Sequence, residues 1–211
     1  AVREAMRCMN CGNGASVSSD ACIACLTCVR VCPFEIPKIK EDENFAYIDN
    51  DCQSCGMCVV ECPAKAIEFK GPYEDMGKGQ LDEVFNKAKT SEPLIINFYC
   101  SYNLDLALSK EELPENIRQV NLLSLGKLSP GLILDAFEKG ADGVLITSCD
   151  DSCHFGDSCN TWAEQRAKTA IDFLASIGIE KERIMYHMLP DQDGDGFLQT
   201  ANQLMEEIKR L

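Results

Sequence analysis

The sequence predicts two domains of different class: a small, cysteine-rich α+β domain, then an α/β domain whose four-stranded parallel sheet is flanked by helices. Two observations predict this division. In the first third of the chain, eight cysteines fall into two runs with identical spacing, at residues 22–32 and 52–62. Further along, four apolar, β-branched segments of strand length alternate with helical segments, which is typical of a parallel sheet with right-handed crossovers.

The composition excludes several classes of protein. The 211 residues are 45% hydrophobic and 26% charged, as in an ordinary globular protein. The formal net charge of −14 argues against binding of nucleic acid, whose phosphates would be repelled, and fits a protein partner with a basic docking face. The opening AVREAMRCMNCG lacks the apolar core of a secretory signal, and no run of eighteen apolar residues occurs. We therefore expect a cytoplasmic protein without a membrane span.

Cysteine spacing points to metal binding rather than to disulfides. The pattern C-x2-C-x2-C-x3-C-P occurs at residues 22–33 and again at 52–63. This run is typical of bacterial two-cluster ferredoxins, in which the fourth cysteine of each run binds the cluster of the other. Zinc also binds four thiolates, but its ligands come as separated CxxC pairs. We expect two 4Fe-4S clusters, one bound by Cys22, Cys25, Cys28 and Cys62, the other by Cys52, Cys55, Cys58 and Cys32.

We assign residues 15–72 to this α+β, ferredoxin-like domain. Its two halves are an internal repeat, CIACLTCVRVCPFEIPKI against CQSCGMCVVECPAKAIEF, and each is too short to bury an apolar core, so the clusters must supply cohesion. Small or short residues, Ala24, Thr27, Ser54 and Gly56, let backbone N–H groups approach the sulfurs. The preceding segment 1–14 holds a lone CxxC, Cys8 and Cys11, that is either half of another cluster or unligated.

Residues 73–92 read as a linker with a short helix, LDEVFNKAK, and residues 93–211 as the α/β domain. The strands are expected at 94–100, 117–124, 143–149 and 184–189. Helices are expected at 129–140, 161–178 and 196–211, the first two ending at Gly140 and Gly178, since glycine after the last periodic residue is a stop signal.

The four remaining cysteines are expected to converge. Cys100 and Cys149 end predicted strands, while Cys153 and Cys159 lie in the predicted loop after the third strand. In open parallel sheets, ligands bind outside the carboxyl ends of the strands. The alternative is that some are packed as apolar residues, which is common for free cysteine. The polar residues 150–152 and 157–158 argue against burial in a core.

Residues 91–211 resemble the delta subunit of methyl-viologen-reducing hydrogenase. The resemblance rests on YCSYNLD (99–105), LILDAFEKGADGVLITSC (132–149), the CHF with a following Asn (153–160) and EQRAKTAIDFLASIGIEKERI (164–184). It implies a 2Fe-2S cluster, for which Cys100, Cys149, Cys153 and Cys159 are the available thiols. Two family cysteines are missing, one where residues 97–99 stand and one where Ser124 stands. Cys159, which the family does not normally have, is expected to substitute.

Shorter motifs carry less information. REAMRCMNCG is similar to the tail of the flavin-containing small subunit of glutamate synthase. DQDGDGFLQTAN (191–202) mimics a calcium loop, but Asn202 stands where a bidentate Glu is required, so we read a polar turn capping the last helix. His154 is expected to be a spare loop residue rather than an iron ligand, and His187 a core residue within a strand.

No nucleophile–base constellation, GxSxG motif or phosphate loop is present. We therefore expect a non-catalytic electron-transfer subunit of an oxidoreductase complex. The resemblance implies partners of three kinds in an anaerobe: a flavoprotein, a hydrogenase or formate dehydrogenase, and a heterodisulfide-reductase-like acceptor. The alternative is a portion or subunit of an NAD(P)H-linked flavin oxidoreductase, in which the second domain is a cluster-free docking scaffold.

Overall fold

The computed structural model of the chain describes residues 14–40, 42–69, 76–86, 92–100, 113–122, 124–150, 153, 155–190 and 193–211. The chain divides into two compact units, Ala1–Asp75 and Met76–Leu211. No helix within the described ranges is both long enough and apolar enough to cross a membrane.

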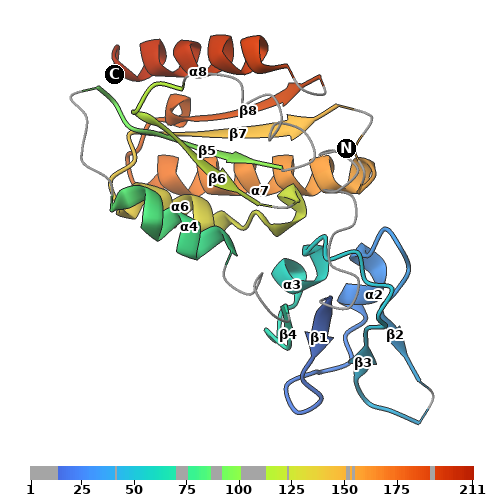
Figure 1. The fold of residues 1–211 in the computed structure, drawn as a ribbon. Helices are drawn as coiled ribbons and strands as arrows, with labels where there is room; N and C mark the ends of the chain where they lie inside the picture. The colour runs from blue at the N-terminus through green and yellow to red at the C-terminus, as the bar shows by residue number, and fades with distance from the viewer. Residues whose placement is uncertain are drawn as a thin grey trace. The chain divides into compact units, whose positions relative to one another are not determined.

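The described part of the first unit contains two short helices and two small antiparallel sheets (Figure 1). Both helices start within a cysteine run, immediately before its third cysteine. The elements are α2 (Thr27–Val31) and α3 (Met57–Glu61), the paired strands β1 (Ala15–Val17) and β4 (Ile67–Phe69), and the paired strands β2 (Lys38–Ile39) and β3 (Ala46–Tyr47). These elements are α+β in kind, while the ferredoxin-like fold itself stays a prediction.

The core of the first unit contains few large apolar side chains. Its buried cluster consists of three alanines, three cysteines, Ile67 and Phe69. Gly14, just before β1, is needed because a Cβ there would lie 2.5 Å from the Cβ of Cys52. So little apolar surface is buried that packing alone gives this unit a weak driving force for folding.

The backbone of the two cysteine runs repeats as closely as their sequences do. Three residues of each half have positive φ, and the two sets are thirty positions apart: Ala24, Leu26 and Glu35 at 52°, 63° and 55°, and Ser54, Gly56 and Lys65 at 56°, 86° and 52°. Only one of the six is glycine, although this conformation costs other residues about 1 kcal/mol or more each. Such strain is retained where the surroundings require one backbone shape.

The second unit contains the predicted four-stranded sheet. The strands are β5 (Ile95–Tyr99), β6 (Ile117–Asn121), β7 (Gly143–Cys149) and β8 (Ile184–Leu189), and their order in the sheet is β6-β5-β7-β8 with every pair parallel. From β5 the chain continues to β6, its neighbour on one side in the sheet, whereas from β7 it continues to β8, which lies in the opposite direction across the sheet. The strand order therefore reverses between β5 and β7, and parallel sheets place their binding crevices at such a point.

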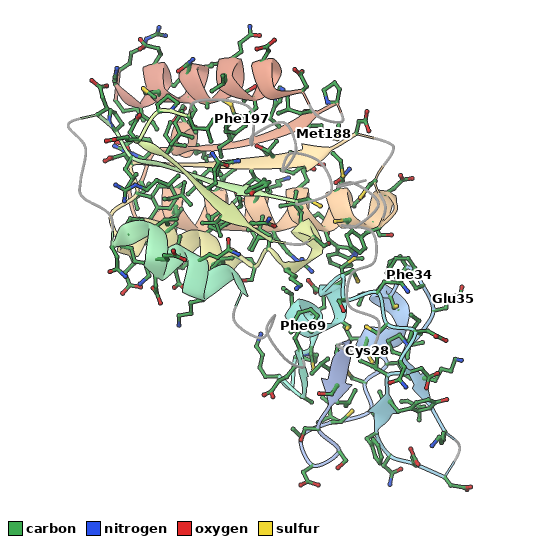
Figure 2. The ribbon with its side chains drawn as sticks, viewed as in Figure 1. Cys28, Phe34, Glu35, Phe69, Met188 and Phe197 are labelled. Carbon is green, nitrogen blue, oxygen red and sulfur yellow. The ribbon has the colours of Figure 1, made fainter. Side chains whose placement is uncertain are left out.

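Helices cover both faces of this sheet, as predicted (Figure 1). On one face α8 (Gly194–Ile208) packs Phe197, Ala201 and Leu204 against Ile95 and Leu145, and Figure 2 shows Phe197 between this helix and the strands. The other face is covered by α4 (Met76–Phe85), α6 (Pro130–Glu138) and α7 (Asp157–Ser176). Two 3-10 turns complete the described elements, η1 (Leu125–Lys127) and η2 (Lys181–Arg183).

The helix predicted within the linker belongs to the second unit. It is α4, and it covers the edge strand β6: Gln80 accepts the backbone N–H of Asn121 at 2.7 Å, and Arg118 donates to the carbonyl of Val84. The predicted polar turn before the last helix is confirmed, because Asp193 accepts the N–H of Gly196 at 2.9 Å as the N-cap of α8. The prediction for His187 is wrong: β8 is an edge strand, and His187 is exposed.

A buried row of polar side chains crosses the middle of the sheet. Thr147 on β7 donates to Oδ1 of Asn97 on β5 at 2.8 Å, and Nδ2 of Asn97 donates to Oε1 of Gln119 on β6 at 2.7 Å. Thr147 and Asn97 have no exposed surface. Buried polar groups of this kind fix the register of neighbouring strands because losing a partner is costly.

We predict that Thr147→Val destabilises the protein by about 1–3 kcal/mol, because the isosteric valine leaves Oδ1 of Asn97 without its donor. The measurement is urea unfolding followed by circular dichroism. Thr169→Val is the matched control, since the Thr169 hydroxyl is exposed and bonds only the carbonyl of Gln165 among the described contacts. Equal unfolding free energies for the two variants would contradict a structural role for the buried row.

Candidate metal centres

The first cysteine pocket lies at the start of α2. It is lined by Cys22, Cys25 and Cys28 of the first run and by Cys62 of the second, together with Ile23, Ala24, Leu26, Thr27, Ala46, Ala64 and Ile67. Positive φ at Ala24 and Leu26 bends the loop around the pocket. The sulfurs have hydrogen-bond partners, among them the N–H of Ala46 for Cys22 at 3.5 Å, the hydroxyl of Thr27 for Cys25 at 3.3 Å and the N–H of Ala66 for Cys62 at 3.3 Å.

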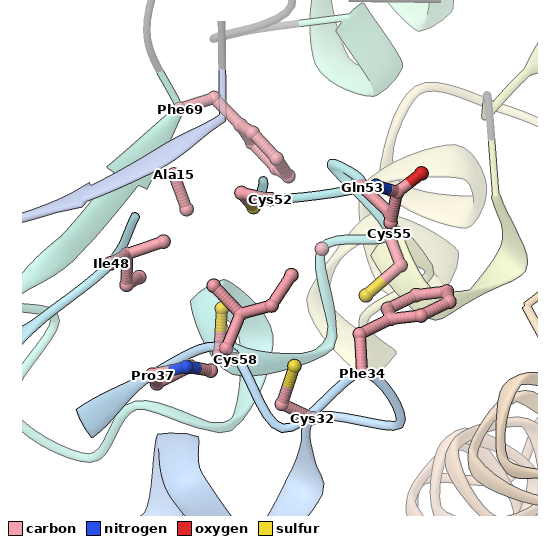
Figure 3. Close-up of a pocket in the computed structure, with 12 residues that line it drawn as sticks. Ala15, Cys32, Phe34, Pro37, Ile48, Cys52, Gln53, Cys55, Cys58 and Phe69 are labelled. Atoms are coloured by element: carbon pink, nitrogen blue, oxygen red, sulfur yellow. The ribbon is translucent and has the colours of Figure 1, made fainter. Parts of the chain in front are cut away.

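The second cysteine pocket repeats this arrangement at the start of α3. It is lined by Cys52, Cys55 and Cys58 of the second run and by Cys32 of the first. Figure 3 shows the sulfurs of Cys55, Cys58 and Cys32 directed into the space that they share. Apolar residues form the remaining wall, including Phe34, Ile36, Pro37, Ile48 and Phe69. Each pocket thus takes three cysteines from one run and the fourth from the other run, which is the grouping predicted from the spacing.

The two cysteine pockets fit a polynuclear iron–sulfur cluster. Among the described residues, no three Cys, His, Asp or Glu side chains are grouped closely enough to hold a single metal ion. The four sulfurs of each pocket instead surround a cavity. Burial raises the pKa of the Cys58 thiol, and its neighbouring thiolates raise it further. A bound cationic metal centre compensates both costs, since metal-bound thiols lose their protons.

Cys25 behaves differently from Cys58. The hydrogen bond between the Cys25 sulfur and the Thr27 hydroxyl is the largest cause that lowers the pKa of the Cys25 thiol, and the charge of Arg30 lowers it further. The guanidinium of Arg30 donates to the carbonyl of Cys25 at 3.1 Å. The first cysteine pocket therefore contains one sulfur whose anionic form is already stabilised before any metal binds.

In the second unit, three cysteines meet at the carboxyl end of β7. Cys153 shares hydrogen bonds with both Cys149 and Cys159, and its bond to Cys149 is the largest cause that raises its pKa, to about 11. The bond to Cys153, followed by burial, likewise raises the pKa of Cys159. Asn160 ties this group to the sheet, because its side-chain amide donates to the carbonyl of Cys149 at 2.7 Å.

Two sequence predictions for this group need correction. Cys159 is not in a loop but in the first turn of α7, which starts at Asp157 after Gly156 with a φ of 73°. The polar neighbours suggested exposed thiols, yet Cys100, Cys149 and Cys159 are buried and only Cys153 of the four is partly exposed. Cys149 ends the buried strand β7 and Cys159 lies in the first turn of α7, so both sulfurs belong to packed elements and not to an open loop.

Ser124, which stands where the family resemblance implies a missing cysteine, lies beside this group. Its hydroxyl oxygen is 3.4 Å from the Cys159 sulfur and also accepts the N–H of Gly126 at 3.0 Å. Arg166, buried in α7, holds η1 in place by donating to the carbonyls of Gly126 and Leu128 at 2.8 and 3.0 Å. Ser124 therefore occupies a fixed position next to a candidate ligand.

Cys100 directly follows β5, the strand beside β7. Tyr99 is in register with Thr147, so Cys100 and Cys149 stand at the ends of neighbouring strands, at the point where the strand order reverses. The remaining motif residues, Cys8, Cys11 and His154, lie outside the described residues. The two alternatives for Cys8 and Cys11, the prediction that His154 is not an iron ligand, and the resemblance of the N-terminal segment to glutamate synthase therefore stay untested.

Comparison with known proteins agrees with both halves of this description. A 4Fe-4S dicluster domain matches residues 21–67, and the family of the methyl-viologen-reducing hydrogenase delta subunit matches residues 95–211. The chain is 32% identical over 130 residues to the vhc iron-sulfur subunit of the F420-non-reducing hydrogenase of Methanococcus voltae, and the match covers 59% of this chain and 90% of that protein.

Two further relatives show the range of proteins that contain this region. One is the vhu iron-sulfur subunit of the F420-non-reducing hydrogenase of Methanococcus maripaludis, 30% identical over 127 residues, with 57% of this chain and 94% of that protein covered. The other belongs to the ferredoxin/F(420)H(2)-dependent CoB-CoM heterodisulfide reductase of Methanosarcina acetivorans and is 32% identical over 129 residues; the match covers 58% of this chain but only 16% of that protein. The chain thus belongs to the methyl-viologen-reducing hydrogenase delta-subunit family, with a 4Fe-4S dicluster domain preceding the family region.

Proposed function

We propose that this chain is an electron-transfer subunit that holds two 4Fe-4S clusters in the cysteine pockets of its first unit and a 2Fe-2S cluster at the sheet rim of its second. The observation that carries the proposal is the grouping of the sulfurs: each pocket is lined by four cysteines drawn from both runs. The family and its named iron-sulfur subunits support the same function.

The residues of the chain would bind the clusters, shield them from water and adjust their reduction potentials, while the bound clusters would supply one-electron redox chemistry. Cys22, Cys25, Cys28 and Cys62 would hold one cubane, and Cys32, Cys52, Cys55 and Cys58 the other. The apolar walls of the pockets exclude water, and backbone donors such as the N–H of Ala66 stabilise the thiolates.

The sheet rim of the second unit would hold the 2Fe-2S cluster through Cys100, Cys149, Cys153 and Cys159. Three of these thiols already share hydrogen bonds, and the fourth ends the neighbouring strand. Thiols with raised pKa values bind metal only on losing their protons, so uptake at this site is favoured at higher pH. As partners we propose a hydrogenase or formate dehydrogenase, a flavoprotein and a heterodisulfide-reductase-like acceptor in an anaerobic cytoplasm.

The crossed cysteine sets make a sharp prediction. Cys25→Ser and Cys62→Ser should change the electron paramagnetic resonance signal of the same 4Fe-4S cluster, because both residues line the first cysteine pocket. Cys55→Ser and Cys32→Ser should change the signal of the other cluster. The four variants serve as controls for one another in anaerobically purified protein. If Cys62→Ser altered the same signal as Cys55→Ser, each run would bind its own cluster and the crossed assignment would be wrong.

The third cluster is tested by iron content. We expect about ten irons per chain, falling to about eight in Cys149→Ser, with a 2Fe-2S signal lost and both 4Fe-4S signals kept. Unchanged spectra in that variant would refute the assignment. About eight irons in the unmutated chain, with both 4Fe-4S signals present, would instead favour a second unit that serves as a cluster-free docking scaffold.

Ser124 allows a rescue experiment. We predict that Cys159→Ala abolishes the 2Fe-2S signal and that adding Ser124→Cys restores it at least in part, because a thiol at position 124 would stand next to the vacated sulfur position. Ser129→Cys in the Cys159→Ala background is the control, since Ser129 caps α6 and should give no rescue. A full 2Fe-2S signal in Cys159→Ala alone would show that Cys159 is not a ligand.

A further inference from the structure

The two cysteine pockets share a backbone but differ in the side chains around their sulfurs. Positive φ recurs at positions thirty residues apart, and the turns after the fourth cysteines match: Glu35 and Lys65 donate their N–H groups to the carbonyls of Cys32 and Cys62 at 3.3 and 3.2 Å. Equivalent positions can therefore be compared one by one. A side chain that differs between equivalent positions changes the environment of one cluster relative to the other.

The most direct difference is at Thr27. Its hydroxyl oxygen is 3.3 Å from the sulfur of Cys25, and the equivalent residue of the other half is Met57, which has no donor. When the Cys25 sulfur is an iron-bound thiolate it carries no proton, so Thr27 must be the donor. A donor to a cluster sulfur stabilises the extra negative charge of the reduced state and raises the reduction potential.

Charged side chains differ in the same direction. Arg30 donates to the carbonyl of Cys25 at 3.1 Å, and its equivalent is Val60. Lys65 follows Cys62, which lines the first pocket, whereas its equivalent Glu35 follows Cys32, which lines the second. Arg30 is therefore a cation beside the first pocket that has no equivalent at the second, and Lys65 and Glu35 place opposite charges at equivalent positions.

An acidic hollow adjoins the second pocket. It is lined by Glu35, Asp49 and Asp51 against the single cation Lys38, and it shares Phe34, Ile36 and Gln53 with the second pocket. Figure 2 shows Phe34 and Glu35 next to each other in this region. The residues close in sequence to the cysteines of the first pocket also include the acids Asp20 and Glu61, which the bases Arg30 and Lys65 match in number. Since exposed charges are screened by salt, the Thr27 hydrogen bond is expected to be the larger effect.

We propose that the two 4Fe-4S clusters have unequal potentials and that the cluster in the first cysteine pocket is reduced first, with Thr27 as the main tuning residue. This inference rests on the proposed function, because it requires both clusters. One electron donated to either pocket then settles in the first: the second cluster loses that electron as the first gains it, and no proton or bond is exchanged. In the singly reduced unit, the electron therefore resides mainly on the cluster in the first cysteine pocket.

The test is stepwise anaerobic reduction of the full chain with dithionite, followed by electron paramagnetic resonance. The unmutated protein should show two one-electron steps for the 4Fe-4S clusters. Thr27→Val should shift only the higher of the two reduction potentials to a more negative value, so the difference between the two potentials becomes smaller. Thr27→Ser, which keeps the hydroxyl, should leave the higher potential unchanged. Arg30→Met should produce a smaller shift in the same direction that shrinks as salt is raised, and Arg30→Lys should retain most of the original potential.

Each outcome decides the question. Equal potentials with both cubane signals present, or a Thr27→Val shift confined to the lower step, would overturn this inference and leave the proposed function standing. Absence of cubane signals in the unmutated chain would overturn the proposed function itself, and this inference with it. If Thr27→Val fails to assemble its cluster, the variants Arg30→Met, Arg30→Lys and Thr27→Ser still decide whether side chains around the first cysteine pocket raise the potential of its cluster.

Discussion

With the proposed clusters bound, bonds between thiolates and metal would supply most of the cohesion of the first unit, because its own packing supplies little. Its buried cluster consists mainly of alanines and cysteines, and its sheets have two strands of two or three residues each. Five residues other than glycine also adopt positive φ there. A metal cluster bound by cysteines of both runs would offset both the missing apolar surface and the backbone strain, and it would tie the two halves of the unit together.

The second unit is stable for the opposite reason. Its sheet buries large apolar residues on the face covered by α8, and polar contacts such as Thr147 with Asn97 fix the strands in register. The proposed metal site at its rim would therefore be an addition to a folded scaffold. On this proposal, the clusters would organise the first unit, whereas the second unit would retain its fold whether or not a cluster is bound.

The sequence predicted the parts of this architecture that depend on the spacing of cysteines and of apolar residues along the chain. The cysteine intervals predicted which sulfurs share a pocket, and the apolar β-branched segments predicted all four strands of the sheet. The sequence did not predict features that depend on how distant parts of the chain pack together. Cys159 joins helix α7 because Gly156 lets the helix begin earlier, and His187 is exposed because β8 is the sheet edge. The local sequence around Cys159 does not show where α7 begins, and the local sequence around His187 does not show that β8 lies at the edge of the sheet.

The same distinction applies to the tuning of the sites. A motif specifies ligands, and ligands alone would make the two cysteine pockets equivalent. Their difference comes from residues between the ligands, such as Thr27 opposite Met57 and Arg30 opposite Val60, which the spacing pattern leaves free to vary. The second unit shows a similar division, since Ser124 and Arg166 position the sulfur group without belonging to it. If the two clusters are tuned as proposed, the site that an electron prefers is set by the few positions at which the two halves of the repeat differ.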